Sequence, residues 1–139
     1  MNRREFLLGG LGLVATETLF GAEFANRGKW ERLSLAYQHV HVGLEKPFSI
    51  LHISDTHLAS AYPHEPEVKQ KLTQSRMRTF GGKQEEALAA SLAWAKKNVD
   101  CVLHTGDLID WQSEANFDLV RKFAGDIALG TMGNHEYSP

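Results

Sequence analysis

The stretch FSILHISDTH, residues 48–57, decides the fold of this chain. Its first six residues, 48–53, form a mostly apolar run that predicts a strand. An aspartate and a histidine, Asp55 and His57, follow almost at once. In an extended segment, side chains two residues apart point to the same side, so this carboxylate and this imidazole can bind one metal ion together. Taken alone, so short a motif is better explained as an ordinary loop.

A second cluster, GDLID at residues 106–110, follows the apolar run 101–105, which predicts a short buried strand. A glycine turn would hold the Asp107 carboxylate at the end of that strand, where its two oxygens can bridge two cations. We interpret Asp110 first as a helix-start residue or as a support for a metal ligand, with direct binding of an ion as the alternative.

A third cluster, GNHE at residues 133–136, follows the strand-like run 127–132. The amide oxygen of Asn134 is a neutral ligand, so it can bind a second ion without adding negative charge. The neighbouring His135 is then free to face a substrate, while Glu136 has an uncertain, supporting role. A turn asparagine and a surface histidine would each be the simpler interpretation in isolation. Together with the other two clusters, they indicate a metal site.

Two amphipathic stretches separate the clusters and predict helices, one over 85–98 and one from an N-cap at Ser113 to Gly125. Strand, helix, strand, helix, strand is the order of an α/β fold with a mainly parallel sheet. Each cluster follows the carboxyl end of a strand, where open α/β sheets place their sites. Looser alternation over 32–42 predicts an antiparallel edge strand. The long polar connection 58–84 is expected to be functional or partly helical.

Size and composition restrict the protein class. The 139 residues allow one domain, and the hydrophobic content of 42% is that of an ordinary globular protein. The formal net charge is -2 and the sequence has no basic stripe, so nothing in it indicates a nucleic-acid-binding protein. The single cysteine, Cys101, excludes an internal disulfide framework and a cysteine-rich zinc site.

The N-terminus has the pattern of an export signal. The pair Arg3-Arg4 precedes a weakly hydrophobic, glycine-rich run, which looks like a twin-arginine signal. We therefore assign residues 1–29 to a signal or N-terminal anchor and 30–139 to the domain. An amphipathic first helix is the alternative. Because no clean cleavage site is visible, we expect a periplasmic protein or one anchored to the membrane and facing outward, with the twin-arginine export machinery as a partner.

The three clusters, in this order and one β-α unit apart, resemble the first three motifs of the calcineurin-like metallophosphoesterase superfamily: D-x-H, G-D-x-x-D and G-N-H-[DE]. FSILHISDTH is also similar to the opening strand of exported bacterial members. The resemblance covers residues 33–137. It implies a β-sandwich flanked by helices, of which this chain would form the N-terminal half. It also implies an enzyme that hydrolyses phosphomonoesters or phosphodiesters.

By position, the resemblance implies that Asp55 and His57 bind a first metal ion and that Asp107 bridges it to a second, which Asn134 also binds. His135 would be the catalytic residue that stabilises or protonates the phosphate group. The implied cofactors are two divalent or trivalent ions such as Mn, Fe or Zn, and the implied attacking group is a bridging hydroxide. The substrate would be a phosphoester of unspecified kind.

The sequence departs from the family pattern in one respect. The later histidine and the G-H-x-H motif that complete the family's site do not occur before Pro139. We therefore expect an N-terminal portion that carries half of a dinuclear site and has little or no activity by itself. The alternative is a non-catalytic binding module that keeps the phosphoesterase fold.

The remaining charged and histidine side chains have simpler interpretations. The basic residues of the long connection could meet a phosphate, but we interpret them first as solvated charges: Arg76, Arg78 and Lys83. Among the other histidines, we expect His52 and His104 to be packed within strands and His39 and His41 to face solvent. His64 lies in the long loop, from which it could approach the site.

Overall fold

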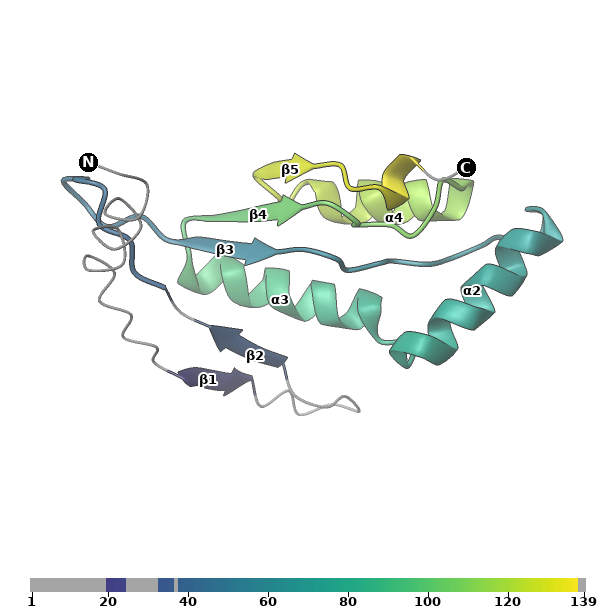
Figure 1. The fold of residues 1–139 in the computed structure, drawn as a ribbon, viewed down its shortest axis with the longest axis horizontal. Coiled ribbons are helices and arrows are strands. Elements are labelled where there is room, and N and C mark those ends of the chain that lie inside the picture. The colour runs from purple at the N-terminus through teal and green to yellow at the C-terminus, as the bar shows by residue number, and fades with distance from the viewer. Residues whose placement is uncertain (1–19, 25–32, 37, 138–139) are drawn as a thin grey trace, which may run out of the picture. The chain divides into compact units, whose positions relative to one another are not determined.

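A computed structural model describes residues 20–24, 33–36 and 38–137. The chain divides into two compact units, residues 1–47 and residues 48–139. In the first unit, β1 (Phe20–Phe24) pairs antiparallel with β2 (Leu33–Ala36) (Figure 1). The expected edge strand is therefore shorter than 32–42, and its antiparallel partner is β1. The arginine pair lies outside the described residues, and the assignment of 1–29 to a signal stays a prediction.

The second unit is built on a three-stranded parallel sheet in the order β3-β4-β5 (Figure 1). Its strands are β3 (Ile50–Ile53), β4 (Cys101–Thr105) and β5 (Leu129–Thr131). The α/β class and the parallel sheet predicted from the sequence are confirmed. The first strand begins two residues later than predicted. Both the backbone N–H and the hydroxyl of Ser49 donate to the Asp100 carboxylate, at 2.7 and 2.6 Å, so the N–H is not used in a strand ladder.

Three helices connect and extend these strands: α2 (Glu67–Phe80), α3 (Gln84–Asn98) and α4 (Glu114–Ala124). The long polar connection is thus largely one helix, α2. The predicted N-cap of α4 is confirmed, because the Ser113 side chain accepts the backbone N–H of Asn116 at 3.2 Å. None of these helices, and no other helix of the described part of the chain, is long and apolar enough to cross a membrane.

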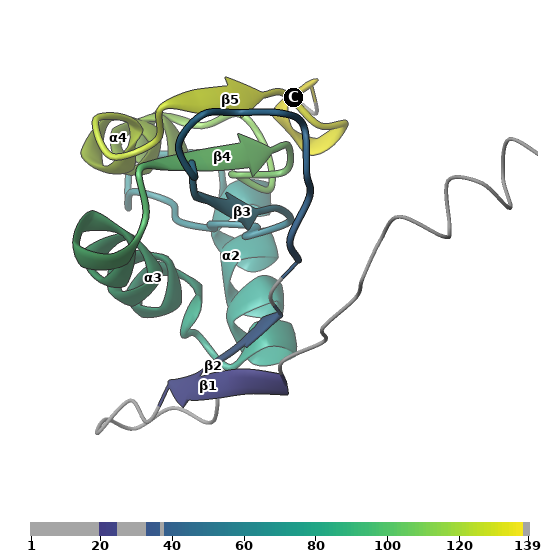
Figure 2. The ribbon, with the colours of Figure 1, turned by 90° about the vertical axis from the view of Figure 1, so that its left-hand side faces the viewer.

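The hydrophobic core lies between the sheet and helices α3 and α4, which cover the same face (Figure 2). Right-handed crossovers that add each strand on the same side require this arrangement. Helix α3 buries Leu88, Leu92 and Ala95 against the sheet. Helix α4 buries Phe123, whereas its Phe117 is 42% exposed. The core therefore fixes the strands whose ends carry the candidate site.

Candidate active site

The loops after β3 and β4 run side by side and bring the first two clusters together. The backbone N–H of Asp55 donates to the carbonyl of Gly106 at 3.1 Å, and that of His57 donates to the carbonyl of Asp107 at 2.9 Å. A parallel β-bridge between Leu58 and Ile109 continues the pairing of the two loops. The parallel sheet thus extends as a backbone ladder into the two loops, and this ladder sets the register of their side chains.

The candidate ligands of these two loops share an unusual backbone. Asp55, His57 and Asp107 have positive φ angles of 54°, 46° and 54°. The expectation that Asp55 and His57 lie in an extended segment is therefore wrong, and their side chains converge through left-handed turns instead. Such a backbone is disfavoured for residues other than glycine and is found at functional sites.

The three side chains form one group with metal-binding geometry. The Nε2 atom of His57 lies 4.0 Å from Asp55 Oδ1 and 4.0 Å from Asp107 Oδ2. All three ligand atoms lie within 4.8 Å of one another. Donors about 2.0–2.2 Å from one tetrahedral ion lie about 3.3–3.6 Å apart, so the three atoms are near one another but would move closer together to share an ion. The oxygen and imidazole donors suit Mn, Fe or Zn, so the residues present fit the metal that the motifs imply.

The loop of the third cluster, residues 133–136, packs against Asp107. The backbone N–H of His135, the residue after Asn134, donates to Asp107 Oδ1 at 3.0 Å. This approach requires glycine: a Cβ atom on Gly133 would lie 2.6 Å from the Asp107 nitrogen. On the facing loop, Gly106 has a φ of 90°. Gly106 and Gly133 therefore allow the backbones of their two loops to approach each other beside Asp107, the predicted bridging carboxylate.

Glu136 joins the second and third loops. Its Oε2 atom accepts the backbone N–H groups of Asp107 and Gly133 at 2.9 and 2.5 Å, and its Oε1 atom accepts that of Ile109 at 3.1 Å. Burial acts to raise the pKa of Glu136, but the backbone donors outweigh it and lower the pKa below its usual value. Glu136, whose role the sequence left uncertain, holds the carboxylate loops in place.

Asp110 is fully buried and faces two histidines. Its Oδ1 atom lies 3.0 Å from Nδ1 of His57 and 2.8 Å from Nδ1 of His135, and its side chain is 0% exposed. Its Oδ2 atom accepts a hydrogen bond from Nε of Arg76. A carboxylate already paired with a guanidinium is better suited to orient histidines than to bind a further ion. With Nδ1 of His57 bound to Asp110, the opposite nitrogen faces Asp55 and Asp107.

His135 lies beside the ligand group. Its ring packs edge-on against that of His57, with centroids 4.6 Å apart, and its side chain is 25% exposed. Asn134 is exposed, and its backbone carbonyl accepts the N–H of Tyr137 at 3.2 Å in the short helix His135–Tyr137. The structure thus brings Asp55, His57, Asp107 and His135 together, with Asn134 next to His135 in the same loop. Their roles in metal binding and catalysis stay predictions.

The histidines outside the motifs do not belong to the group formed by Asp55, His57 and Asp107, although Nε2 of His104 lies 3.2 Å from the hydroxyl of Thr56. His104 is 2% exposed within β4, and His52 lies 2.6 Å from the hydroxyl of Thr105. His64 pairs with Glu114 at 2.9 Å, which leaves the alternative of an approach to the site without support.

The sequence missed two residues that contact the site, and both lie on α2. Arg76 was interpreted as a solvated loop charge, but it pairs with the buried carboxylate of Asp110. The Phe80 ring stacks on His57 at 5.7 Å between centroids. The four-residue spacing of this pair was visible in the sequence, but its meaning depended on recognising a helix in the polar connection.

The family model of the calcineurin-like phosphoesterases matches residues 48–139. The chain belongs to the calcineurin-like phosphoesterase family. The match begins where the second compact unit begins and includes all three ligand loops. No curated protein and no solved structure matches the chain. The family supports a hydrolase that uses metal ions.

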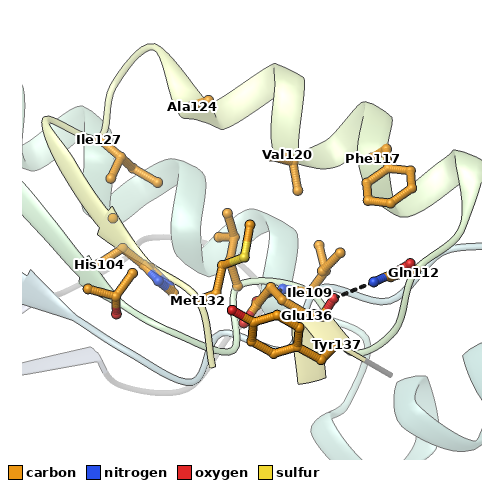
Figure 3. Close-up of a pocket in the computed structure, with 13 residues that line it drawn as sticks. His104, Ile109, Gln112, Phe117, Val120, Ala124, Ile127, Met132, Glu136 and Tyr137 are labelled. Carbon is orange, nitrogen blue, oxygen red and sulfur yellow. Dashed lines mark hydrogen bonds between the residues drawn. The ribbon is translucent and has the colours of Figure 1, made fainter. Parts of the chain in front are cut away.

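This calcineurin-like phosphoesterase also has a mostly apolar cavity of about 570 Å³. Figure 3 shows Phe117 and Val120 of α4 on one side of it and Met132 and Tyr137 on the other. Glu136 lies at its edge, where its backbone carbonyl accepts a hydrogen bond from the Gln112 amide (Figure 3). None of the three grouped metal-type ligands lines this cavity.

Proposed function

We propose that the chain is a metal-dependent phosphoesterase that hydrolyses phosphomonoesters or phosphodiesters at a dinuclear site on its three loops. The observation that carries the proposal is the convergence of Asp55, His57 and Asp107, whose ligand atoms lie within 4.8 Å of one another. All three lie within residues 48–139, which the model of the calcineurin-like phosphoesterase family matches.

The donor set suggests how the ions would be shared. Asp55, His57 and Asp107 would hold the first ion, and Asp107 and Asn134 would contribute to the second. When bound, such ions neutralise charge on phosphoryl oxygens and lower the pKa of water. Because the second ion has fewer donors among the described residues, we expect it to bind more weakly than the first.

The histidine beside the ligands supplies the acid–base chemistry in this proposal. Asp110 lies 2.8 Å from Nδ1 of His135, and its backbone carbonyl lies 3.0 Å from the same nitrogen. With Nδ1 held in this way, Nε2 of His135 is the atom available to donate a proton to the leaving oxygen.

The test is metal-dependent hydrolysis by the purified chain. p-Nitrophenyl phosphate and bis(p-nitrophenyl) phosphate represent the two ester classes, and millimolar Mn²⁺ would load a weak second site. We expect slow hydrolysis that stops when EDTA is added. Asp107→Asn should reduce hydrolysis to the metal-free blank, because an amide cannot give two anionic oxygens to two ions.

Asp126→Asn is the matched control, since Asp126 pairs with Lys96 on the surface at 2.8 Å. It should keep the wild-type rate. Metal binding without hydrolysis of either ester would overturn the proposal that this chain is active by itself and would favour the non-catalytic binding module. Normal hydrolysis by Asp107→Asn would exclude the bridging role.

We also propose that the twin-arginine machinery exports the protein and that it acts on its substrate outside the cytoplasm. The support is the pair Arg3-Arg4 before a weakly hydrophobic run. Export of folded protein suits an enzyme that binds its ions before leaving the cytoplasm. Retention of the N-terminus as a membrane anchor belongs to the same proposal.

A further inference from the structure

Helix α2 contributes two side chains to the site and none to the core. No residue of α2 is buried, yet Arg76 contacts the buried Asp110 and, one turn later, Phe80 contacts the candidate ligand His57. Arg76 contacts Asp110 through Nε, and the Phe80 ring lies nearly parallel to the His57 ring, with an interplanar angle of 9° and centroids 5.7 Å apart. The helix therefore reaches the site through the side chains of this pair.

The Asp110 carboxylate divides its two oxygens between different partners. Oδ1 faces the Nδ1 atoms of His57 and His135, at 3.0 and 2.8 Å, while Oδ2 is bound by Arg76. A carboxylate with no exposed surface needs a partner for each oxygen. The bond from Arg76 therefore opposes rotation of the carboxylate and keeps Oδ1 directed at the histidines.

The orientation of His57 depends on these contacts. Its Nδ1 atom is on the Asp110 side, and its Nε2 atom lies 4.0 Å from both Asp55 and Asp107. The stacked Phe80 ring restricts tilting of the imidazole plane. With the His57 ring held by these two contacts, its Nε2 atom faces Asp55 and Asp107 and its Nδ1 atom faces the Asp110 carboxylate.

We propose that Arg76 and Phe80 make α2 a positioning element of the metal site, and this rests on the proposed function. Arg76 fixes the Asp110 carboxylate, Asp110 fixes Nδ1 of His57, and Phe80 fixes the plane of the His57 ring. Neither α2 residue binds the ion. Together they keep Nε2 of His57 directed at the position between Asp55 and Asp107.

The chain offers variants that separate a hydrogen bond from a charge. Arg76→Ala removes both. Arg76→Gln removes the charge but places an amide N–H donor the same number of bonds from the backbone as Nε of arginine. Arg78→Ala is the control for lost charge on the same helix, because Arg78 is exposed. Phe80→Ala removes the stacked ring, and Met77→Ala is its control at a position that is 49% exposed.

Two measurements on the full chain do not require activity. In metal-free protein, ¹⁵N chemical shifts of the histidine rings report which nitrogen of His57 carries the proton. In a Co²⁺ titration, the visible absorption bands report the affinity and the coordination geometry. We expect Arg76→Ala to mix the two tautomers of His57 and to weaken Co²⁺ binding about 10-fold, as loss of an outer partner of a metal ligand does.

Arg76→Gln should keep the wild-type tautomer and a Co²⁺ affinity closer to wild type than to Arg76→Ala. Phe80→Ala should weaken Co²⁺ binding with the tautomer unchanged, and both controls should match wild type. The proposal is overturned if Arg76→Gln behaves as Arg76→Ala does, or if Arg76→Ala leaves both the tautomer and the affinity unchanged. In hydrolysis assays, a raised KM with unchanged kcat would also overturn it, because that pattern indicates a phosphate contact.

These results are independent of the proposed function. If neither ester is hydrolysed, the function fails, while the tautomer and the Co²⁺ affinity still decide the role of Arg76 and Phe80. If the ester assays succeed and Arg76→Ala leaves both the tautomer and the Co²⁺ affinity unchanged, the function stands and the positioning role is rejected.

Discussion

The backbone of Asp55, His57 and Asp107 adopts positive φ angles, a conformation that costs free energy. Left-handed φ angles cost residues other than glycine about 1–2 kcal/mol each. Aspartate and histidine are among the residues that tolerate this conformation best. The backbone hydrogen bonds between the two loops hold these conformations in place. The strain and the ligand geometry therefore occur at the same three positions.

Gly133→Ala should disturb Asp107 without altering any ligand. A Cβ atom at this position would lie 2.6 Å from the Asp107 nitrogen, so the loops must separate. We expect a loss of about 1–3 kcal/mol in the free energy of unfolding, typical of overpacking, together with weaker Mn²⁺ binding. Urea denaturation and isothermal titration with Mn²⁺ would measure the two effects.

Gly130→Ala is the matched control for this substitution. Its added Cβ would lie 3.9 Å from the nearest atom, the carbonyl oxygen of His104, which is ordinary van der Waals contact. It should leave Mn²⁺ affinity unchanged. Wild-type Mn²⁺ affinity in Gly133→Ala would show that the close approach of the loops is unnecessary for the site.

At the scale of single residues, the sequence predicted that Asp55, His57 and Asp107 lie close together but not the backbone conformation that brings them there. Residue type and order identified Asp55, His57 and Asp107 because carboxylates and imidazoles after strands are a recognisable chemical pattern. Their left-handed backbone was not predicted, since it depends on hydrogen bonds to a loop about 50 residues away. Arg76 was misinterpreted for the same reason: its partner, Asp110, is distant in sequence.

At the scale of elements, the strands and their connecting helices were largely predictable. The run 101–105 is a strand with the predicted bounds, and α3 begins one residue before the predicted helix. Local periodicity was sufficient there because each element buries one regular stripe. The helix α2 was less visible, since it has no buried residues and so no apolar stripe facing the core.

The central strand β4 contains a buried histidine that should make stability depend on pH. His104 is 2% exposed, and its Nε2 atom lies 3.2 Å from the Thr56 hydroxyl. Burial lowers the pKa of His104 below its ordinary value of 6.5 and outweighs the nearby carboxylates, which act in the opposite direction. The unfolded chain therefore takes up this proton at a higher pH than the folded chain.

The sign of the effect follows from that difference. Below pH 6.5 the unfolded state binds the proton first, so the free energy of unfolding should fall as pH falls, until the lower folded pKa is reached. The slope for one proton is at most about 1.4 kcal/mol per pH unit. Urea denaturation between pH 5 and 8, followed by tryptophan fluorescence, should show a smaller slope in His104→Gln. Equal slopes in the two proteins would contradict the prediction.

At the scale of the whole molecule, the chain is two units, and only the second carries the site. The family match and the second unit both begin at residue 48, whereas the sequence placed the domain boundary after residue 29. Residues 30–47 therefore lie outside the family match. The boundary at residue 29 depends on the export signal and stays a prediction that a transport assay can test.

The export proposal predicts a specific effect of the arginine pair. Twin-arginine machinery recognises the pair itself rather than its charge, so replacing Arg3 and Arg4 together with lysine should block transport. The measurement is periplasmic fluorescence of the whole chain carrying a C-terminal green fluorescent protein in a bacterial host. Arg27→Lys, which also conserves charge but lies outside the pair, should be exported as wild type is. Periplasmic fluorescence of the double lysine variant at the wild-type level would contradict the twin-arginine assignment, and the amphipathic helix would become the better interpretation of residues 1–29.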